Sequence, residues 1–157
     1  MPGLNLKSPL GIITQGAFCV IMGIGDLKIQ MTESIPEQWA ERAQYDFDTA
    51  QAMLRSERYL YVLFCCQQAL EKIVKGVIAK QTGEFPPRIH DLMGLARKAE
   101  IVLDDDQVRL MRQLSEYYLN SRYPDQIVNA SADITRGTAA KVLNETEAML
   151  KWLSSML

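Results

Sequence analysis

The stretch SRYPD, residues 121–125, places an arginine, a tyrosine and an aspartate around a proline. The guanidinium of Arg122 is a planar fork of donors that matches a phosphate group, and an exposed Tyr123 ring can stack on a nucleobase. The structural alternatives are an Arg122–Asp125 ion pair at an exposed corner and a buried Tyr123 that wedges the turn. Because Pro124 disfavours helical geometry at Tyr123, a helix must end near Arg122 in either case.

A second set of donors lies upstream, in the run FCCQQALEKIVK. Helical spacings of four and three residues put Gln68, Lys72 and Lys75 on one stripe, where an amide and two ammonium groups can hold an anion. The alternative is an ordinary solvated face, on which Glu71 and Lys75 form a weak exposed pair. The residues alone leave both interpretations open.

His90 is the only histidine in the chain. Histidine exchanges protons near neutral pH, so this side chain is the obvious general base if folding or a second subunit brings it to Arg122. The alternative is structural, because His90 or Asp91 can cap a short helix that begins here. We expect the capping and packing role for His90.

Metal and phosphate-loop chemistry find little support in the sequence. One histidine and no Cys-x-x-Cys motif leave only the carboxylates of residues 104–106, which fit better at a helix start, where they face the positive end of the helix dipole. No glycine-rich phosphate-binding motif is present. The expectation is therefore no metal and no other cofactor.

The composition points to one domain without a strong overall charge. The 157 residues suit a single hydrophobic core, and 17 basic against 19 acidic residues give a net charge of -2, so any anion site must be local. Of the three cysteines, Cys65 and Cys66 are neighbours that point apart on a helix, which suggests no disulfide framework. A reducing, cytoplasmic location follows as the expectation, with no membrane association.

Residues 1–30 differ from the rest, being apolar, interrupted by glycines and nearly uncharged. Lys7 is the only basic residue ahead of the apolar run, so a signal peptide fits poorly, and the run is marginal in length for a membrane span. We expect residues 1–30 to be an extension outside the bundle and residues 31–157 to form the domain. The alternative is a short strand or hairpin that packs on the bundle or on a partner subunit.

Helix-period apolar positions follow Met31, without strand-like alternation. Capping signals define the helix starts, and Thr82 with Gly83 ends the most apolar helix, which we expect at the centre. The predicted helices are 34–55, about 57–81, a short one after His90 or Asp91 that ends before Leu103, one from the Asp104–Gln107 capping box to near Arg122, and a last one capped by Ser131 or Asp133. The sequence thus predicts an all-α, up-and-down antiparallel four-helix bundle with one extra short helix.

The order of these motifs resembles the higher eukaryotes and prokaryotes nucleotide-binding (HEPN) domain family. The run FCCQQALEKIVKGVIAKQTGEFPPRIHDLMGLARKA is followed by YYLNSRYPD and a closing amphipathic helix, and the resemblance covers most of residues 39–153. The matching positions are Phe64, Gln67, Gln68, Ala69, Glu71, Lys72, Lys75, His90, Asp91, Leu92, Leu95, Tyr118, Arg122, Tyr123, Pro124 and Asp125. The resemblance implies a helical bundle that commonly dimerises, often works beside a small nucleotidyltransferase, and in many members binds nucleotides or cleaves RNA.

The ribonuclease branch of this family pairs an arginine with a histidine that follows after four to six residues, without a metal. At those positions after Arg122 stand Ile127, Val128 and Asn129, and an asparagine cannot exchange protons. We therefore expect a non-catalytic nucleotide-binding or partner-binding module, a homodimer that acts with a nucleotidyltransferase. The expected nucleotide contacts are Arg122, Tyr123, Asp125, Gln68, Lys72 and Lys75. The alternatives are a toxin-like, metal-independent ribonuclease that uses Arg122 with a displaced His90 or Asn129, and a purely structural dimer.

Overall fold

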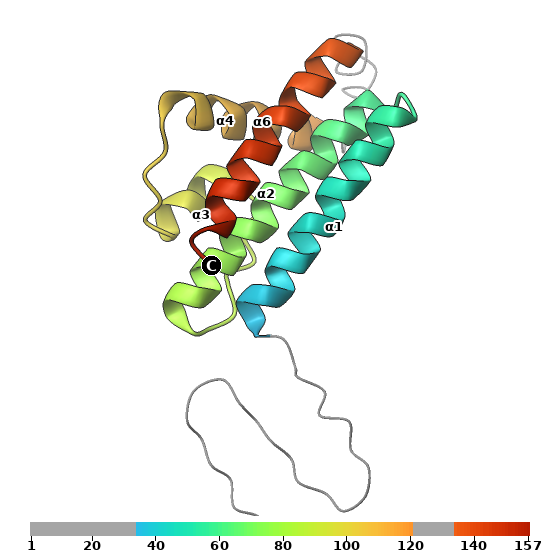
Figure 1. Ribbon diagram of the computed structural model, residues 1–157. Coiled ribbons are helices and arrows are strands. Elements are labelled where there is room, and N and C mark those ends of the chain that lie inside the picture. Colours follow the sequence, from blue (N-terminus) through green and yellow to red (C-terminus); the bar gives the residue numbers. More distant parts are fainter. Residues whose placement is uncertain (1–33, 121–133) are drawn as a thin grey trace, which may run out of the picture. The chain divides into compact units, whose positions relative to one another are not determined.

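The computed structural model describes residues 34–120 and 134–157, and every regular element within these ranges is a helix. The helices are α1 (Ile35–Arg55), α2 (Tyr59–Thr82), the short α3 (Leu92–Lys98), α4 (Asp105–Asn120) and α6 (Arg136–Ser154) (Figure 1). The all-α prediction is confirmed. The expected division between residues 1–30 and 31–157 concerns a segment outside the described residues and stays a prediction.

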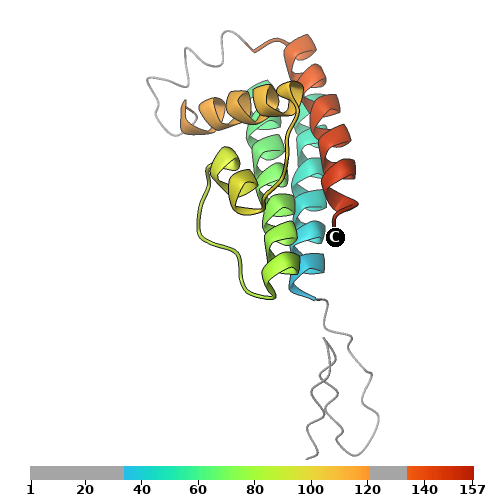
Figure 2. The same ribbon diagram turned by 90° about the vertical axis from the view of Figure 1, so that its left-hand side faces the viewer.

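The helices form three aligned rods with a fourth lying across them. α1 and α2 make an antiparallel hairpin, and α6 packs on both while running in the direction of α2 (Figure 1). α4 crosses α2 at a steep angle, and α3 lies against α2 beside it (Figure 2). The crossing matters for the site because it brings the last turn of α4 onto the first turns of α2, where Tyr118 stacks on Phe64.

α2 occupies the centre of the bundle, as its apolar sequence predicts. Most of its side chains between Val62 and Ala79 are buried, with Leu63, Leu70 and Val74 fully inaccessible to solvent. Around them pack α1, α4 and α6, which contribute Phe47, Leu114 and Leu153, among other buried residues. A helix that is apolar all round is stable only in such a position, because every face must be removed from water.

Local signals set most of the helix ends. Gly83 ends α2 in the left-handed conformation, with φ 71°, and its N–H donates to the carbonyl of Ala79. At the start of α4, Asp104 and Gln107 exchange the two hydrogen bonds of a capping box, at 3.0 and 2.8 Å. Both predictions are confirmed.

Two predicted boundaries need correction. α6 is capped by Thr135, not by Ser131 or Asp133, because the Thr135 hydroxyl accepts a hydrogen bond from the N–H of Thr138 at 3.2 Å. α2 begins at Tyr59 and not near Glu57, because Glu57 has a positive φ of 60° that no helix accommodates. In the described part of the chain, no helix has the length and apolar character needed to cross a membrane.

Candidate functional site

The carboxylate of Glu71 is the centre of a buried polar cluster on α2. It accepts hydrogen bonds from Lys75 Nζ at 2.8 Å and from Gln67 Nε2 at 3.1 Å. The side chains of Glu71 and Lys75 are only 5% and 7% exposed. The alternative in which they form a weak pair on a solvated face is therefore wrong: α3 and its preceding loop, together with α1, cover this face of α2.

Gln67 ties the cluster to the loop before α3. Its Nε2 also donates to the backbone carbonyl of His90 at 3.2 Å, and its Oε1 accepts from Gln68 Nε2 at 2.6 Å. Both ends of this fully buried amide are thus satisfied, as burial requires. Gln67 is not among the predicted site residues, although it is a polar residue at a position of α2 where the helical pattern predicts burial.

Asp91, and not His90, caps α3. The Asp91 carboxylate accepts hydrogen bonds from the backbone N–H groups of Met93 and Gly94, at 3.3 and 2.9 Å. The imidazole of His90 is therefore available for another contact, and its Nδ1 lies 3.1 and 3.2 Å from the two oxygens of Glu71. Of the two expected roles of His90, capping belongs to its neighbour Asp91, while the half-exposed His90 ring contacts Glu71.

His90 also lies beside the last turn of α4. Its ring centroid is 6.3 Å from that of Tyr118, whose ring in turn stacks on Phe64 of α2 with centroids 5.7 Å apart. From this turn the chain continues directly to Arg122. The histidine and the aromatic pair therefore meet beside the last turn of α4, and Gln68 follows Phe64 by one turn of α2.

The two lysines of the predicted anion stripe already hold carboxylates. Lys72 forms an ion pair with Asp46 of α1. Lys75, besides its bond to Glu71, lies 5.5 Å from the centroid of the Trp39 ring, a cation–π contact. An incoming anion would have to compete with these carboxylates for the two ammonium groups.

Neither cysteine of α2 has the properties of a nucleophile. Burial raises the pKa of Cys65 to about 11, with a smaller contribution from the nearby carboxylate of Asp46. Burial likewise raises the pKa of Cys66 to about 12. Because the thiolate is the reactive form, both groups are inert near neutral pH.

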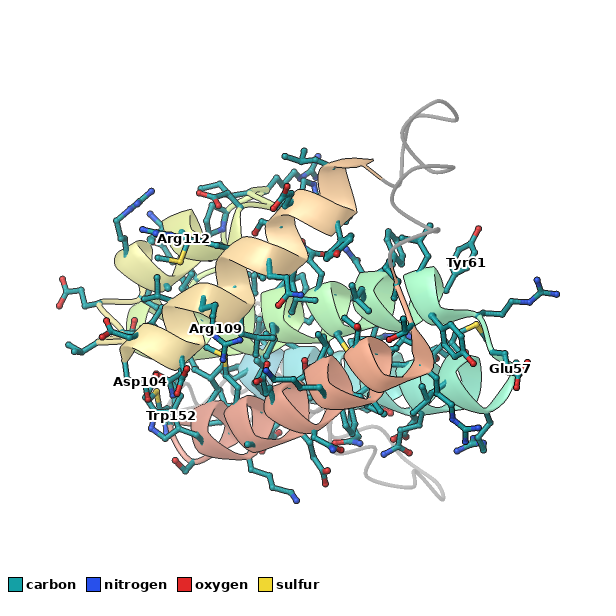
Figure 3. The ribbon with its side chains drawn as sticks, turned by 90° about the horizontal axis from the view of Figure 1, so that it is seen from above. Glu57, Tyr61, Asp104, Arg109, Arg112 and Trp152 are labelled. Atoms are coloured by element: carbon teal, nitrogen blue, oxygen red, sulfur yellow. The ribbon has the colours of Figure 1, made fainter. Side chains whose placement is uncertain are left out.

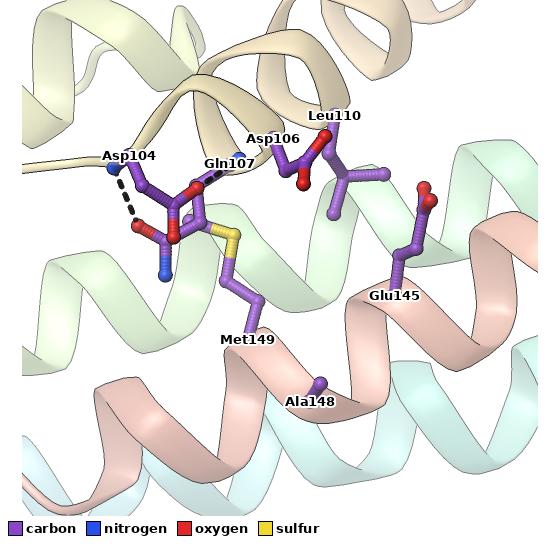
Figure 4. Close-up of a pocket in the computed structure, with 7 residues that line it drawn as sticks. All are labelled: Asp104, Asp106, Gln107, Leu110, Glu145, Ala148 and Met149. Carbon is purple, nitrogen blue, oxygen red and sulfur yellow. Dashed lines mark hydrogen bonds between the residues drawn. The ribbon is translucent and has the colours of Figure 1, made fainter.

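A separate pocket of about 270 Å³ lies between α4 and α6 (Figure 4). Its polar lining is largely acidic, with Asp104, Asp106 and Glu145 over an apolar floor that includes Met149. Arg109 bridges the two helices nearby, at 3.0 Å from Asp106 and 3.3 Å from Glu145 (Figure 3). Three carboxylates would repel a phosphate, so this pocket is a poor nucleotide site.

The remaining predicted site residues, Arg122, Tyr123, Asp125 and Asn129, lie outside the described residues. Their contacts, and the approach of His90 to Arg122, stay predictions. Among residues 34–120 and 134–157, no three His, Cys, Asp or Glu side chains gather in a way that could hold a metal ion.

Comparison with known proteins agrees with the order of motifs. The HEPN domain model matches residues 36–156. The crystal structure of TT1696 from Thermus thermophilus is similar in fold, with a TM-score of 0.68 and 23% identity over 80% of this chain and all of that one. A search of curated proteins found no match. Because the family model spans most of the sequence and the whole described bundle, the chain belongs to the HEPN domain family.

Proposed function

We propose that the chain is a non-catalytic nucleotide-binding or partner-binding module, which works as a homodimer beside a small nucleotidyltransferase. Family membership supports a nucleotide-binding or ribonuclease-like role. The observation that carries the proposal is the position of His90 beside Tyr118 in the last turn of α4, with Gln68 linked to the His90 backbone through Gln67. Arg122 and Tyr123, which follow at once in the sequence, would add a phosphate contact and a stacking ring to polar groups already held in place.

The ion pairs of Lys72 and Lys75 determine which residue is proposed to contact the phosphate. Lys75 remains the internal partner of Glu71, while Lys72 can turn to a phosphate only by leaving Asp46. Arg122 is therefore assigned the main phosphate contact. Gln68 offers amide hydrogen bonds beside it, and Asp125 can accept from a base or ribose donor.

Calorimetric titration with ATP, GTP, CTP, UTP and a short RNA tests the module. We expect binding by the wild type, loss of binding in Arg122→Ala, and unchanged binding in Arg112→Ala. Arg112 is a matched control because it is an exposed arginine on α4 (Figure 3). Equal affinity in a folded Arg122→Ala variant would remove the proposed phosphate contact.

The ribonuclease alternative is favoured by one observation, the position of His90 beside Tyr118 in the last turn of α4. Against it stands the absence of a histidine at residues 127–129. Incubating the RNA with the protein in the presence of a metal chelator separates the two functions. Cleavage that persists with chelator and disappears in His90→Ala would replace the binding module by the enzyme.

The homodimer is proposed to use the exposed apolar side chains near the start of α2. Tyr61 is 59% exposed and points away from the bundle (Figure 3), and Leu119 on α4 is exposed to the same extent. Sedimentation analysis of Tyr61→Ser tests this contact, with Tyr45→Ser, a similarly exposed tyrosine on α1, as the control. A monomeric wild type, or a dimer that Tyr61→Ser leaves intact, would contradict the assignment.

A further inference from the structure

We propose that Glu71 fixes the imidazole of His90 as its Nδ1–H tautomer and thereby presents Nε2 as a hydrogen-bond acceptor for a ribose hydroxyl of a bound nucleotide. The first half concerns the free protein alone. The second half rests on the proposed nucleotide binding. Glu71 is then a positioning residue, and His90 is the residue that contacts the ligand.

The tautomer follows from the partner of Nδ1. An ionised carboxylate can only accept hydrogen bonds, and both oxygens of Glu71 lie within 3.2 Å of Nδ1. The ammonium of Lys75, 2.8 Å from Oε1, forms an ion pair with this buried carboxylate. Nδ1 must therefore carry the proton, and in the neutral ring the lone pair is left on Nε2.

The backbone on both sides of the imidazole is fixed. The carbonyl of His90 accepts the hydrogen bond from Gln67, and the next residue, Asp91, is held by its bonds to the start of α3. The ring of Tyr118 flanks the imidazole on the α4 side. Because the imidazole is already restrained in the free protein, little additional conformational entropy is lost when a ligand binds.

In the Glu71–His90 pair, the carboxylate is buried and the imidazole is exposed. The Glu71 side chain is 5% exposed whereas that of His90 is 57% exposed. Nδ1 and Nε2 diverge widely on the ring, so an Nδ1 directed at the buried carboxylate leaves Nε2 on the accessible side. No residue in the described ranges forms a hydrogen bond with Nε2. A donor such as a hydroxyl complements this lone pair, and the ribose of a nucleotide carries hydroxyl donors.

The first test is nitrogen NMR of the imidazole, followed over a range of pH so that the signals of the neutral ring are read directly. The chain has one histidine, so a tag-free sample gives one unambiguous pair of ring signals. We expect a protonated Nδ1 and an unprotonated Nε2. A protonated Nε2 would overturn the proposal, and this result needs no variant.

The variant Glu71→Gln tests the positioning role, because a neutral amide can donate as well as accept. We expect the two nitrogen signals to move toward a mixture of tautomers. Glu147→Gln is the matched control: Glu147 also pairs with a lysine one turn on, Lys151, at 2.7 Å, but on an exposed face away from His90. Identical spectra for wild type and a folded Glu71→Gln would contradict the role of Glu71.

The ligand is tested by titrating the wild type with ribonucleoside monophosphates and with their 2′-deoxy counterparts. We expect the Nε2 signal to shift more with the ribonucleotide, and both the removal of the hydroxyl and His90→Ala to weaken binding on the order of tenfold, the loss of one hydrogen bond. Equal responses to both sugars would refute the 2′-hydroxyl contact although the nucleotide binds. No response to either would refute the nucleotide site itself, while the tautomer in the free protein is decided separately.

Discussion

Glu71 Oε1 lies 3.1 Å from Nδ1 of His90, a residue that belongs to the loop before α3 rather than to the same helix. This contact joins the centre of α2 to the loop that delivers α3. It also couples a buried ion pair to the only histidine of the chain. The position of the histidine is thus set by the interior of the bundle.

The buried cluster predicts a large difference between two chemically identical substitutions. Glu71→Gln leaves the buried ammonium of Lys75 without its charged partner, which costs about 3–5 kcal/mol. Glu147→Gln breaks an exposed pair of the same spacing and costs about 0.5 kcal/mol or less. Urea unfolding of both variants measures the two values. Equal losses would mean that burial does not strengthen the Glu71 pair.

Much of the fold could be predicted from the sequence because its signals are local. Gly83 ends α2 by its own conformational freedom, and Asp104 with Gln107 forms a capping box from residues three apart. The central position of α2 follows from its apolar surface alone. These features can be predicted without knowing the tertiary contacts of the helices.

The steep crossing of α4 and the burial of Glu71 and Lys75 could not be predicted in this way. A helical pattern places residues on one stripe of a helix but does not show which neighbouring element covers that stripe. Here the loop before α3 packs against the stripe of α2 that carries Glu71. The cap of α6 was misassigned for a related reason: the sequence just before α6 holds several good capping residues, and local preference alone does not choose among them.

Two glycine substitutions are expected to change stability in opposite directions. Gly83→Ala forces an alanine into the left-handed conformation, at φ 71°, and costs about 1 kcal/mol or more; no atom lies close enough to clash, so the cost is conformational. Gly137→Ala, in the first turn of α6, meets only an ordinary contact at 3.7 Å and should be neutral or stabilising by up to about 1 kcal/mol. Thermal unfolding compares them, and a stabilised Gly83→Ala would contradict the assigned helix end.

The thiol of Cys65 should react slowly until the solution is strongly alkaline. Burial raises its pKa to about 11, so its alkylation near neutral pH should be on the order of 100-fold slower than that of a free cysteine and should keep rising toward pH 11. The folded state holds the Cys65 proton more tightly than the unfolded state does. The protonated thiol therefore makes its full contribution to the free energy of unfolding below pH 9, and this contribution is lost as the pH rises toward 11. Iodoacetamide labelling of a Cys19→Ser protein, followed by mass spectrometry, measures the rate. A plateau already near pH 9 would show that the thiol is not desolvated.

We propose that a nucleotide binds beside the last turn of α4, near His90 and Tyr118 and within reach of Gln68. Nitrogen-labelled protein titrated with the nucleotides tests it most directly, because each backbone and side-chain amide reports its own surroundings. We expect the largest shifts on the side-chain amide of Gln68, the imidazole of His90 and the backbone of Tyr118, and we expect Arg122→Ala to abolish them. Shifts confined to the acidic pocket between α4 and α6, or none at saturating nucleotide, would contradict it.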